Sequence, residues 1–266
     1  MAKLYIVGTP IGNMKDITLR AIDTLRAADI VACEDTRHSR PLLAQYGINA
    51  QLVAYHKFNE AECARKLVDF VKSGKNVALI TDAGMPSVSD PGAEVVGLCR
   101  TEGVEVESVP GPSAVATAVA LSGVKSTGFV FLGFLPEKAS ARDELVRRAD
   151  GAELPLVIYV APHDVKKTAA YLAGVLGDRK AYVVREMTKI HESVTETSLA
   201  SFECEERGEI VLIVEGARRE NELLALTPEE HLRRYVEAGM DKKEAVKKVA
   251  AERGVPRNEI YKLSVE

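Results

Sequence analysis

Two carboxylates and two arginines follow the apolar run at residues 30–33. Glu34 and Asp35 come first, and Arg37 and Arg40 follow at short spacing. An arginine can hold a phosphate group through paired hydrogen bonds while a neighbouring carboxylate orients a sugar hydroxyl. Acids that cap a helix N-terminus would give the same composition. The cluster therefore predicts either a helix cap or a polar binding site.

Two further polar clusters also follow apolar runs. Residues 55–60 include His56 and Lys57, and residues 185–192 include Glu186 and Lys189. A lone histidine is more often structural than functional, and a dense charge run is usually a solvated loop. Their placement directly after expected strands nevertheless favours side chains that line a cleft.

The loop at residues 81–92 follows the apolar run 77–80. It holds two Gly, two Pro and two Asp, and this composition can neither continue a helix nor pair as a central strand. Asp82 and Asp90 would repel a polyanion and suit a ribose diol, an amine or a sulfonium. A rigid connection with Asp-capped turns is the alternative interpretation.

Two other Gly/Pro loops also follow expected strands, at residues 8–13 and 110–114. The first is not a dinucleotide fingerprint, because the third Gly of G-x-G-x-x-G is missing and Pro10 lacks an amide hydrogen. Loops that leave the carboxyl ends of parallel strands can meet at one crevice. We therefore expect all three loops to line a single ligand site.

The elements that must position these loops alternate between strand and helix. Strands are expected at residues 4–8, 30–33, 51–54, 77–81 and 104–109, with amphipathic segments between them, and residues 114–120 should form a closely packed helix. A second series follows at 129–132, 156–160, 181–184, 193–196 and 209–214, with helices near 139–150 and 163–174. This pattern predicts two α/β domains, the second with some antiparallel pairing.

Residues 226–266 have a different sequence pattern, which predicts three short helices. Thr227 and Asp241 can each begin a helix, because an acid follows each of them three residues later. Gly239 and Gly254 can end these two helices. The spacing matches a helix-turn-helix, with Arg257, Asn258 and Lys262 on its outward face. We expect domains at residues 1–118, 119–225 and 226–266. The last is either a packed helical module or a contact for nucleic acid.

Composition narrows the class of protein. The chain of 266 residues has 46% hydrophobic residues and a net charge of −4, so nucleic-acid binding would depend on local basic patches. No apolar run is long enough to span a bilayer, and a cytoplasmic location is expected. The four cysteines lie too far apart for a zinc or redox motif, and we expect no metal site.

Five motifs together resemble one family. They are Gly8-Thr9-Pro10-Ile11-Gly12-Asn13, Cys33-Glu34-Asp35-Thr36-Arg37, the stretch from Asp82 to Gly92, Val109-Pro110-Gly111-Pro112-Ser113-Ala114 and Gly133-Phe134-Leu135-Pro136. In this order they are similar to the small-subunit ribosomal RNA methyltransferase I family, part of the tetrapyrrole-methylase-like class of S-adenosylmethionine (SAM) methyltransferases. The resemblance covers essentially the whole chain. Met85 departs from it, because the family has Thr there.

The resemblance implies two α/β domains of the tetrapyrrole methylase type with SAM in the cleft between them, plus the small helix-turn-helix module. It also implies a homodimer, and 2′-O-methylation of a decoding-region cytidine in small-subunit ribosomal RNA, either free or in the assembled subunit. Carried over by position, the residues that would line the SAM site are Pro10, Asp82, Ala83, Gly84, Val88, Ser113 and Ala114.

The polar clusters then become candidates for the RNA side of the reaction. SAM supplies the reactive methyl group, so the protein must mainly hold the sulfonium and the hydroxyl in line. A proton acceptor could add to this, and Glu34 and Lys189 are the catalytic candidates. The candidates for substrate binding are Asp35, Arg37, Arg40, His56, Lys57 and Glu186.

Two other functions fit the sequence less well. A methylase of a corrinoid or porphyrin intermediate would share the fold, because fold does not fix function, but the basic helical tail favours RNA. A SAM-sensing regulator would bind DNA through that tail. Against it, the tail offers few base-reading groups, and the enzyme-like loops would have no role.

Overall fold

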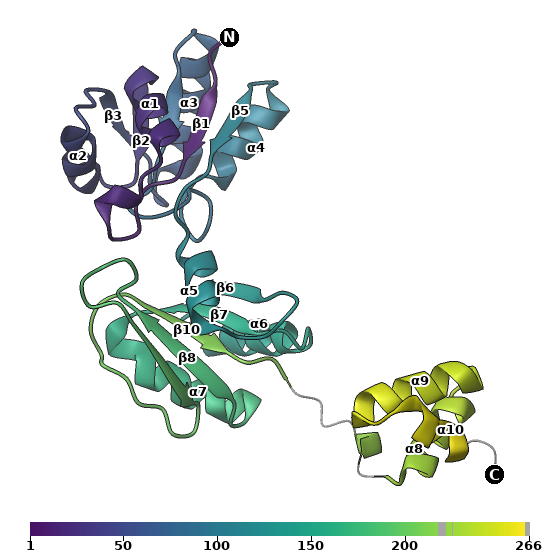
Figure 1. Ribbon diagram of the computed structural model, residues 1–266. Coiled ribbons are helices and arrows are strands. Elements are labelled where there is room, and N and C mark those ends of the chain that lie inside the picture. The colour runs from purple at the N-terminus through teal and green to yellow at the C-terminus, as the bar shows by residue number, and fades with distance from the viewer. Residues whose placement is uncertain (218–221, 225, 264–266) are drawn as a thin grey trace. The chain divides into compact units, whose positions relative to one another are not determined.

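The computed structural model describes residues 1–217, 222–224 and 226–263, and these form two compact units, Met1–Gly216 and Ala217–Glu266 (Figure 1). The predicted limits at 118/119 and 225/226 stay predictions. Each unit is described by itself.

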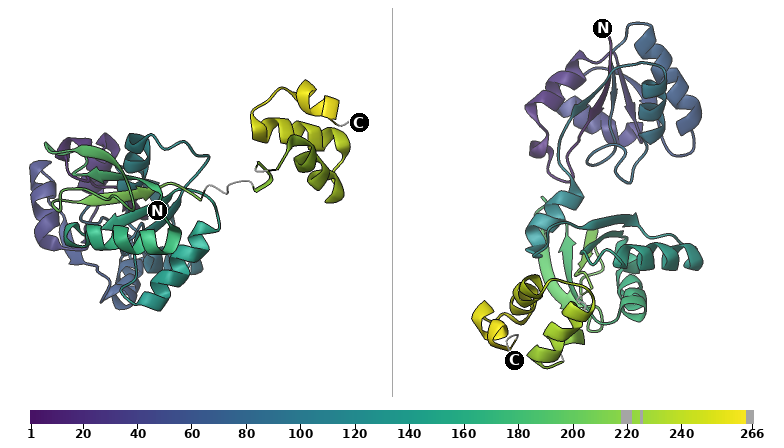
Figure 2. Two further views of the ribbon diagram at one scale, coloured as in Figure 1. Left: turned by 90° about the horizontal axis from the view of Figure 1, so that it is seen from below. Right: turned by 90° about the vertical axis from the view of Figure 1, so that its right-hand side faces the viewer.

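The first half of the larger unit is a parallel sheet covered by helices on both faces (Figure 2). Its strands are β1 (Leu4–Val7), β2 (Ile30–Cys33), β3 (Gln51–Ala54), β4 (Val77–Leu79) and β5 (Val106–Val109), in the order β3-β2-β4-β1-β5. The helices are η1 (Met14–Asp16), α1 (Leu19–Ala27), α2 (Thr36–Gln45), α3 (Glu60–Lys72) and α4 (Ala93–Thr101). Because every pairing is parallel, the loops that follow the strands share one edge of the sheet.

Successive side chains of a strand point to opposite faces of the sheet, and this explains how both faces are buried. Leu4 and Ile6 of β1 join the core that includes α3 residues such as Leu67, whereas Val7 joins the core that includes Leu25 of α1. Strands covered on both faces consist of near-continuous apolar residues, as β2 does with Ile-Val-Ala-Cys. The expected strands and helices of this half are confirmed.

The second half begins with α5 (Ala114–Ser122) and contains a mixed sheet. Its strands are β6 (Val130–Phe134), β7 (Leu156–Val160), β8 (Lys180–Arg185), β9 (Ser193–Ser198) and β10 (Ile210–Val214), in the order β6-β7-β10-β8-β9, with α6 (Ala139–Asp150), η2 (Pro162–Asp164) and α7 (Val165–Leu176) between them. Only β6 and β7 pair in parallel, so the expected antiparallel pairing is confirmed.

The two faces of this mixed sheet have different partners. One face packs against α6 and α7 through residues such as Val146 and Leu172. The other carries α5, and its core includes Ile11 from the loop after β1 and Met187 from the loop after β8. Loops from both halves therefore meet over this second face.

The smaller unit is a bundle of short helices with its own core. It contains η3 (Glu222–Leu224), α8 (Pro228–Glu237), α9 (Lys242–Arg253) and α10 (Arg257–Leu263), packed around residues such as Leu232, Val249 and Ile260. The Thr227 side chain and Glu230 form a capping box at α8, and Gly254 ends α9 in the left-handed conformation. The three predicted helices are confirmed, and Arg257, Asn258 and Lys262 are exposed.

Candidate functional site

A cavity of about 360 Å³ lies between loops of the two sheets. Of the predicted cofactor residues, Asp82, Ala83, Gly84, Val88, Ser113 and Ala114 line it. The mixed sheet supplies lining residues that the sequence analysis did not select, among them Phe134, Tyr159, Met187 and Val211. Phe134 stood in a recognised motif without an assigned role. Nothing in the sequence pointed to Tyr159 as a cavity residue, because it reaches the cavity through the pairing of β6 with β7.

The loops that form this cavity are fixed by backbone contacts. Thr9 and Gly84 exchange hydrogen bonds, with Thr9 N–H donating to Gly84 O at 2.9 Å and Gly84 N–H donating to Thr9 O at 3.2 Å. The Thr9 hydroxyl also donates to Thr81 O at 3.0 Å. This bridge turns the chain so that Ile11 lines the first cavity, whereas Pro10 lines a second one. The placement of Pro10 thus differs from the expected one.

The loop after β4 is held in a conformation that few residues adopt. Ser87 and Ser89 have φ of 68° and 67°, in the left-handed region, and Gly92 has φ of 147°. Such backbone strain persists where the surroundings over-determine the conformation, and it is common at binding sites. Glu60 contributes to this, because its carboxylate accepts a hydrogen bond from Gly92 N–H at 2.9 Å.

Asp90 places a half-buried carboxyl group in the first cavity. Burial and the nearby carboxylates of Glu34 and Asp82 raise the pKa of Asp90 to about 6. Burial and Asp82 also raise the pKa of Glu34. No hydrogen bond or ion pair joins Asp90 to another residue in the described part of the chain. A carboxylate of this kind suits a positively charged ligand.

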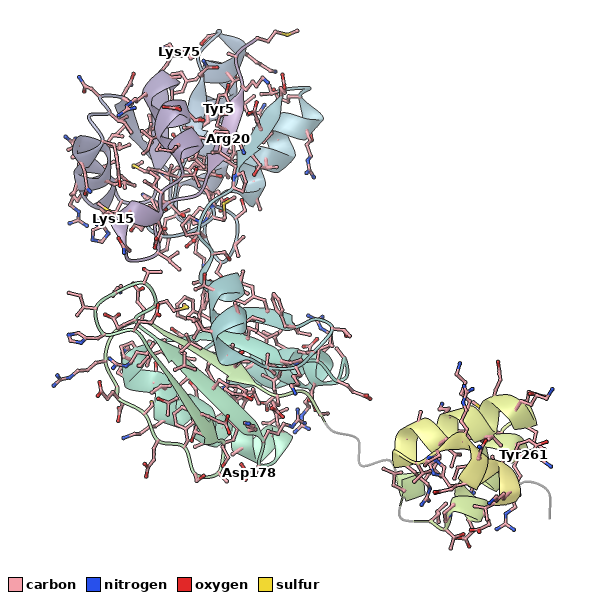
Figure 3. The ribbon with its side chains drawn as sticks, viewed as in Figure 1. Tyr5, Lys15, Arg20, Lys75, Asp178 and Tyr261 are labelled. Atoms are coloured by element: carbon pink, nitrogen blue, oxygen red, sulfur yellow. The ribbon has the colours of Figure 1, made fainter. Side chains whose placement is uncertain are left out.

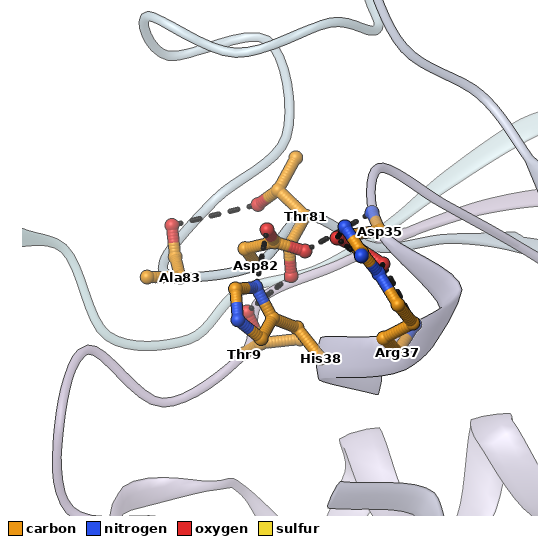
Figure 4. Close-up of polar contacts among 7 residues, drawn as sticks. All are labelled: Thr9, Asp35, Arg37, His38, Thr81, Asp82 and Ala83. Carbon is orange, nitrogen blue, oxygen red and sulfur yellow. Dashed lines mark hydrogen bonds and ion pairs between the residues drawn. The ribbon is translucent and has the colours of Figure 1, made fainter. Parts of the chain in front are cut away.

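Asp82 anchors a second group of polar contacts at the same loop (Figure 4). One carboxylate oxygen accepts a hydrogen bond from Asp35 N–H at 3.2 Å, and the other lies 3.0 Å from Nδ1 of His38. Asp35 caps α2, and Arg37 holds the pKa of the Asp35 carboxyl group down at about 2. Asp35 and Arg37 therefore pair with each other at this edge of the sheet. The helix cap is confirmed, and the polar binding site stays a prediction.

The second cavity, of about 210 Å³, adjoins the first. The two share Ile11, Asp82, Ala83 and Glu209 as lining residues, and the second adds residues such as Pro10, His38 and Lys189. His38 lies between Arg37 and Arg40 of the first polar cluster but was not among the predicted site residues. The carboxylate that orients it lies 44 positions further along the chain, so local spacing gave no signal.

Lys189 is a paired cation in this arrangement. Its ammonium lies 2.9 Å from Glu186 and 3.2 Å from Glu209. Burial lowers the pKa of Lys189, but hydrogen bonds to these two carboxylates outweigh this effect, and the pKa is raised overall. A protonated ammonium cannot accept a proton, so the geometry favours an electrostatic role for Lys189. Glu186, with φ of 51°, also accepts a hydrogen bond from Glu209 N–H at 2.8 Å.

Seven of the predicted residues line neither cavity: Glu34, Asp35, Arg37, Arg40, His56, Lys57 and Glu186. Glu34 is half-buried beside the cavities and acts on Asp90 through its charge. Arg40 on α2 and Lys57 before α3 are exposed. Together with Arg37 and Lys15 on η1, they give the loop edge of the first sheet a set of exposed cations.

Neither a metal site nor a membrane span is found in the described residues. No group of three His, Cys, Asp or Glu side chains there has an arrangement that could hold a metal ion. No described helix combines the length and the apolar composition needed to cross a bilayer.

Comparisons with known proteins show which family this chain is similar to. The family model described as Tetrapyrrole (Corrin/Porphyrin) Methylases matches residues 3–203. Ribosomal RNA small subunit methyltransferase I of Bacillus subtilis is 39% identical, over 98% of this chain and 93% of that protein. The protein of the same name from Thermotoga maritima is 39% identical, over 81% of this chain and 99% of that protein.

A solved structure agrees at the level of fold. Uroporphyrin-III-C-methyltransferase from Thermus thermophilus superposes with a TM-score of 0.58 at 20% identity, over 81% of this chain and 94% of that chain.

Proposed function

The chain belongs to the ribosomal RNA small subunit methyltransferase I family of tetrapyrrole methylases, and we propose that it methylates the ribose 2′-hydroxyl of a decoding-region cytidine in small-subunit ribosomal RNA. SAM is the methyl donor of this class of enzyme. The observation that carries the proposal is the identity of 39% with a relative of that name over 98% of this chain.

The first cavity fits the cofactor. Its lining is largely apolar, with residues such as Val88, Ala114 and Met187, and this suits an adenosine group. Asp90 has no protein hydrogen-bond partner among the described residues, and with Asp82 and Glu34 nearby it would offset the positive sulfonium and ammonium groups. The 81–92 loop contains no Lys or Arg, consistent with a cofactor that carries no phosphate.

When bound, SAM supplies an activated methyl group, and the remaining task of the protein is positioning. Holding a hydroxyl in line with the methyl carbon contributes up to about 7–11 kcal/mol to lowering the barrier. Here the Thr9–Gly84 bridge and the contact of Glu60 with Gly92 hold the loops through the protein's own hydrogen bonds. The second cavity adjoins the first, which allows an acceptor to lie beside the donor.

The exposed cations at the loop edge are proposed to bind the RNA backbone. Arg37 and Arg40 of α2 and Lys57 after β3 are exposed and line neither cavity. Phosphate groups would then lie on the rim, while the uncharged ribose enters the acidic site, where a phosphate would be repelled. Arg257, Asn258 and Lys262 of α10 offer a further polar surface for RNA.

Labelled SAM tests the proposal with four acceptors in parallel. These are small ribosomal subunits from a strain that lacks this activity, protein-free small-subunit RNA, a precorrin and double-stranded DNA. We expect label in the subunits, in the free RNA or in both. Label in the precorrin alone would favour the corrinoid methylase, and SAM-dependent DNA binding without transfer would favour a regulator. Absence of label from every RNA would contradict the proposal.

Two properties follow from the proposed function. A ribosomal RNA substrate would be met in the cytoplasm, and the homodimer implied by the family resemblance would present two active sites. Sedimentation of the purified chain tests the second property: a monomer at micromolar concentration would exclude a stable dimer.

A further inference from the structure

His38 and Asp82 form a pair with the geometry of a general base and its orienting group. Nδ1 of His38 lies 3.0 Å from a carboxylate oxygen of Asp82. Because a carboxylate can only accept, Nδ1 carries the proton, and the lone pair of a neutral ring is then on Nε2. No hydrogen bond joins Nε2 to any residue that the structure describes. Asp82 is itself fixed by the hydrogen bond from Asp35 N–H.

The location of this pair matters as much as its geometry. His38 lines the second cavity, and Asp82 lies on the wall common to both cavities. The second cavity, at about 210 Å³, is smaller than the usual range for a whole drug-sized ligand and matches one part of a larger chain. The His38 side chain is 72% exposed, so an arriving polymer can reach the ring without any rearrangement of the fold.

We propose that the second cavity receives the ribose of the target nucleotide and that Nε2 of His38, oriented by Asp82, accepts the proton of its 2′-hydroxyl. This inference rests on the proposed function and identifies its acceptor subsite and its base. In this proposal His38 takes the place of Glu34 and Lys189, which were the candidates from the sequence.

The ribose oxygen forms a bond to the methyl carbon while the bond between that carbon and the sulfonium sulfur breaks. The electron pair of the broken bond stays on sulfur, which becomes a neutral thioether. The hydroxyl proton passes to Nε2, and the resulting imidazolium is stabilised by the Asp82 carboxylate.

The other candidates for the base are less well placed. Lys189 lines the second cavity, but its pairing with Glu186 and Glu209 keeps it protonated. Glu34 lines neither cavity, and Asp90 lines only the first, where the cofactor's cation would hold it ionised. His38 combines a free ring nitrogen with a place in the acceptor cavity.

The charged groups that face His38 shift its pKa, and this pKa determines how the methyl-transfer rate depends on pH. Asp82 and Asp35 raise its pKa, whereas Arg37 opposes them. Lys189 and Glu209 line the same cavity from the other sheet and form an ion pair, which limits their net effect. Because the base must be neutral, the rate should rise with pH through the pKa of His38 and then level off.

The test measures single-turnover transfer to small subunits at saturating SAM, for the wild type, His38→Ala and His38→Gln. His163→Gln serves as the matched control, since His163 lies 3.2 Å from Asp164 in another exposed His–Asp pair and lines neither cavity. SAM affinity and thermal unfolding are measured for each protein. Added imidazole tests whether a free base can replace the missing ring in His38→Ala.

We expect both His38 variants to lose roughly 10²-fold or more in rate, with SAM affinity unchanged and the rising limb of the pH profile absent. Imidazole should restore part of the rate of His38→Ala, and His163→Gln should behave like wild type. A His38→Ala rate close to wild type, or a loss that imidazole does not relieve, would overturn the inference alone. A wild type that labels no RNA would overturn the proposed function, and the inference with it.

Discussion

Asp90 has a carboxyl group whose environment destabilises the free protein. Its pKa in the folded chain, about 6, lies above the ordinary value near 4 for an unfolded Asp. The folded state therefore binds more protons between these values, and stability falls as the pH rises through them. A group that destabilises the fold and faces a cavity is the arrangement expected of a ligand contact.

Replacing Asp90 by Asn should therefore stabilise the protein above about pH 6, by roughly 1 kcal/mol after allowance for solvent screening. The difference from wild type should shrink as the pH falls toward about 4, where the wild-type carboxyl group is protonated. SAM affinity should decrease because a charge opposite the cofactor's cation is lost. Urea unfolding at several pH values and calorimetric titration measure both effects. A variant that is less stable than wild type at neutral pH would contradict this account of Asp90.

Lys15 and Lys75 offer a matched pair of exposed lysines on the first half of the chain (Figure 3). Lys15 lies on η1, next to Met14 of the second cavity, whereas Lys75 follows α3 and precedes β4, at the opposite end of the sheet from the site. We expect Lys15→Ala to weaken RNA binding and to reduce its salt slope by about one. Lys75→Ala should change neither quantity. Equal effects of the two substitutions would indicate that binding is not directed to the loop edge.

At the scale of elements, the close approach of two loops explains why small residues follow β1 and β5. A Cβ at Gly8 would lie 2.7 Å from Cα of Gly111, which is backbone and cannot move aside without shifting the 110–114 loop. Ser113 and Ala114 of that loop line the first cavity. The spacing between the loops, and hence the shape of the first cavity, depends on the absence of a side chain at Gly8.

Gly8→Ala should therefore lower the free energy of unfolding by about 1–3 kcal/mol and weaken SAM binding. Gly97→Ala is its control, because a Cβ at Gly97 in α4 meets nothing within 4 Å. That change should stabilise the protein by roughly 0.5–1 kcal/mol, since glycine in a helix has more conformational entropy to lose on folding. Urea unfolding and SAM titration of both variants distinguish a local clash from a general intolerance of alanine.

The sequence predicted the elements and several residues that line the first cavity, for reasons that particular residues illustrate. The convergence of the three Gly/Pro loops was expected because loops after parallel strands lie at one edge of a sheet. The family resemblance then selected Asp82, Gly84 and Ser113 within those loops. His38 was not selected, because its importance depends on a carboxylate from another loop. Tyr159 comes to the first cavity through the pairing of β6 with β7, and the raised pKa of Asp90 depends on its burial and on Glu34 and Asp82. Neither is encoded in local spacing.

At the scale of the whole molecule, the two units have separate cores. The apolar clusters of Met1–Gly216 contain no residue of the smaller unit, and the family model matches only residues 3–203. The Thermotoga maritima relative is matched over 99% of its length by 81% of this chain. The first cavity is likewise lined only by residues of the larger unit, and we expect it to form without the helical tail.

A chain ending at Gly216 should therefore bind SAM with unchanged affinity and bind RNA more weakly, with a smaller salt slope because the cations of α10 are absent. Calorimetry and filter binding at several salt concentrations measure these quantities. Loss of SAM binding in the shortened chain would show that the tail supports the cofactor site. Unchanged RNA binding would show that the tail takes no part in substrate recognition.

Nucleoside mass spectrometry of small-subunit RNA tests the central claim most directly. Subunits from a strain that lacks this activity are incubated with the protein and SAM, and their RNA is digested and mapped. The account predicts one new 2′-O-methylcytidine in the decoding region, formed by wild type and strongly reduced with His38→Ala. A methyl group on a base, or no methylated nucleoside at all, would contradict it.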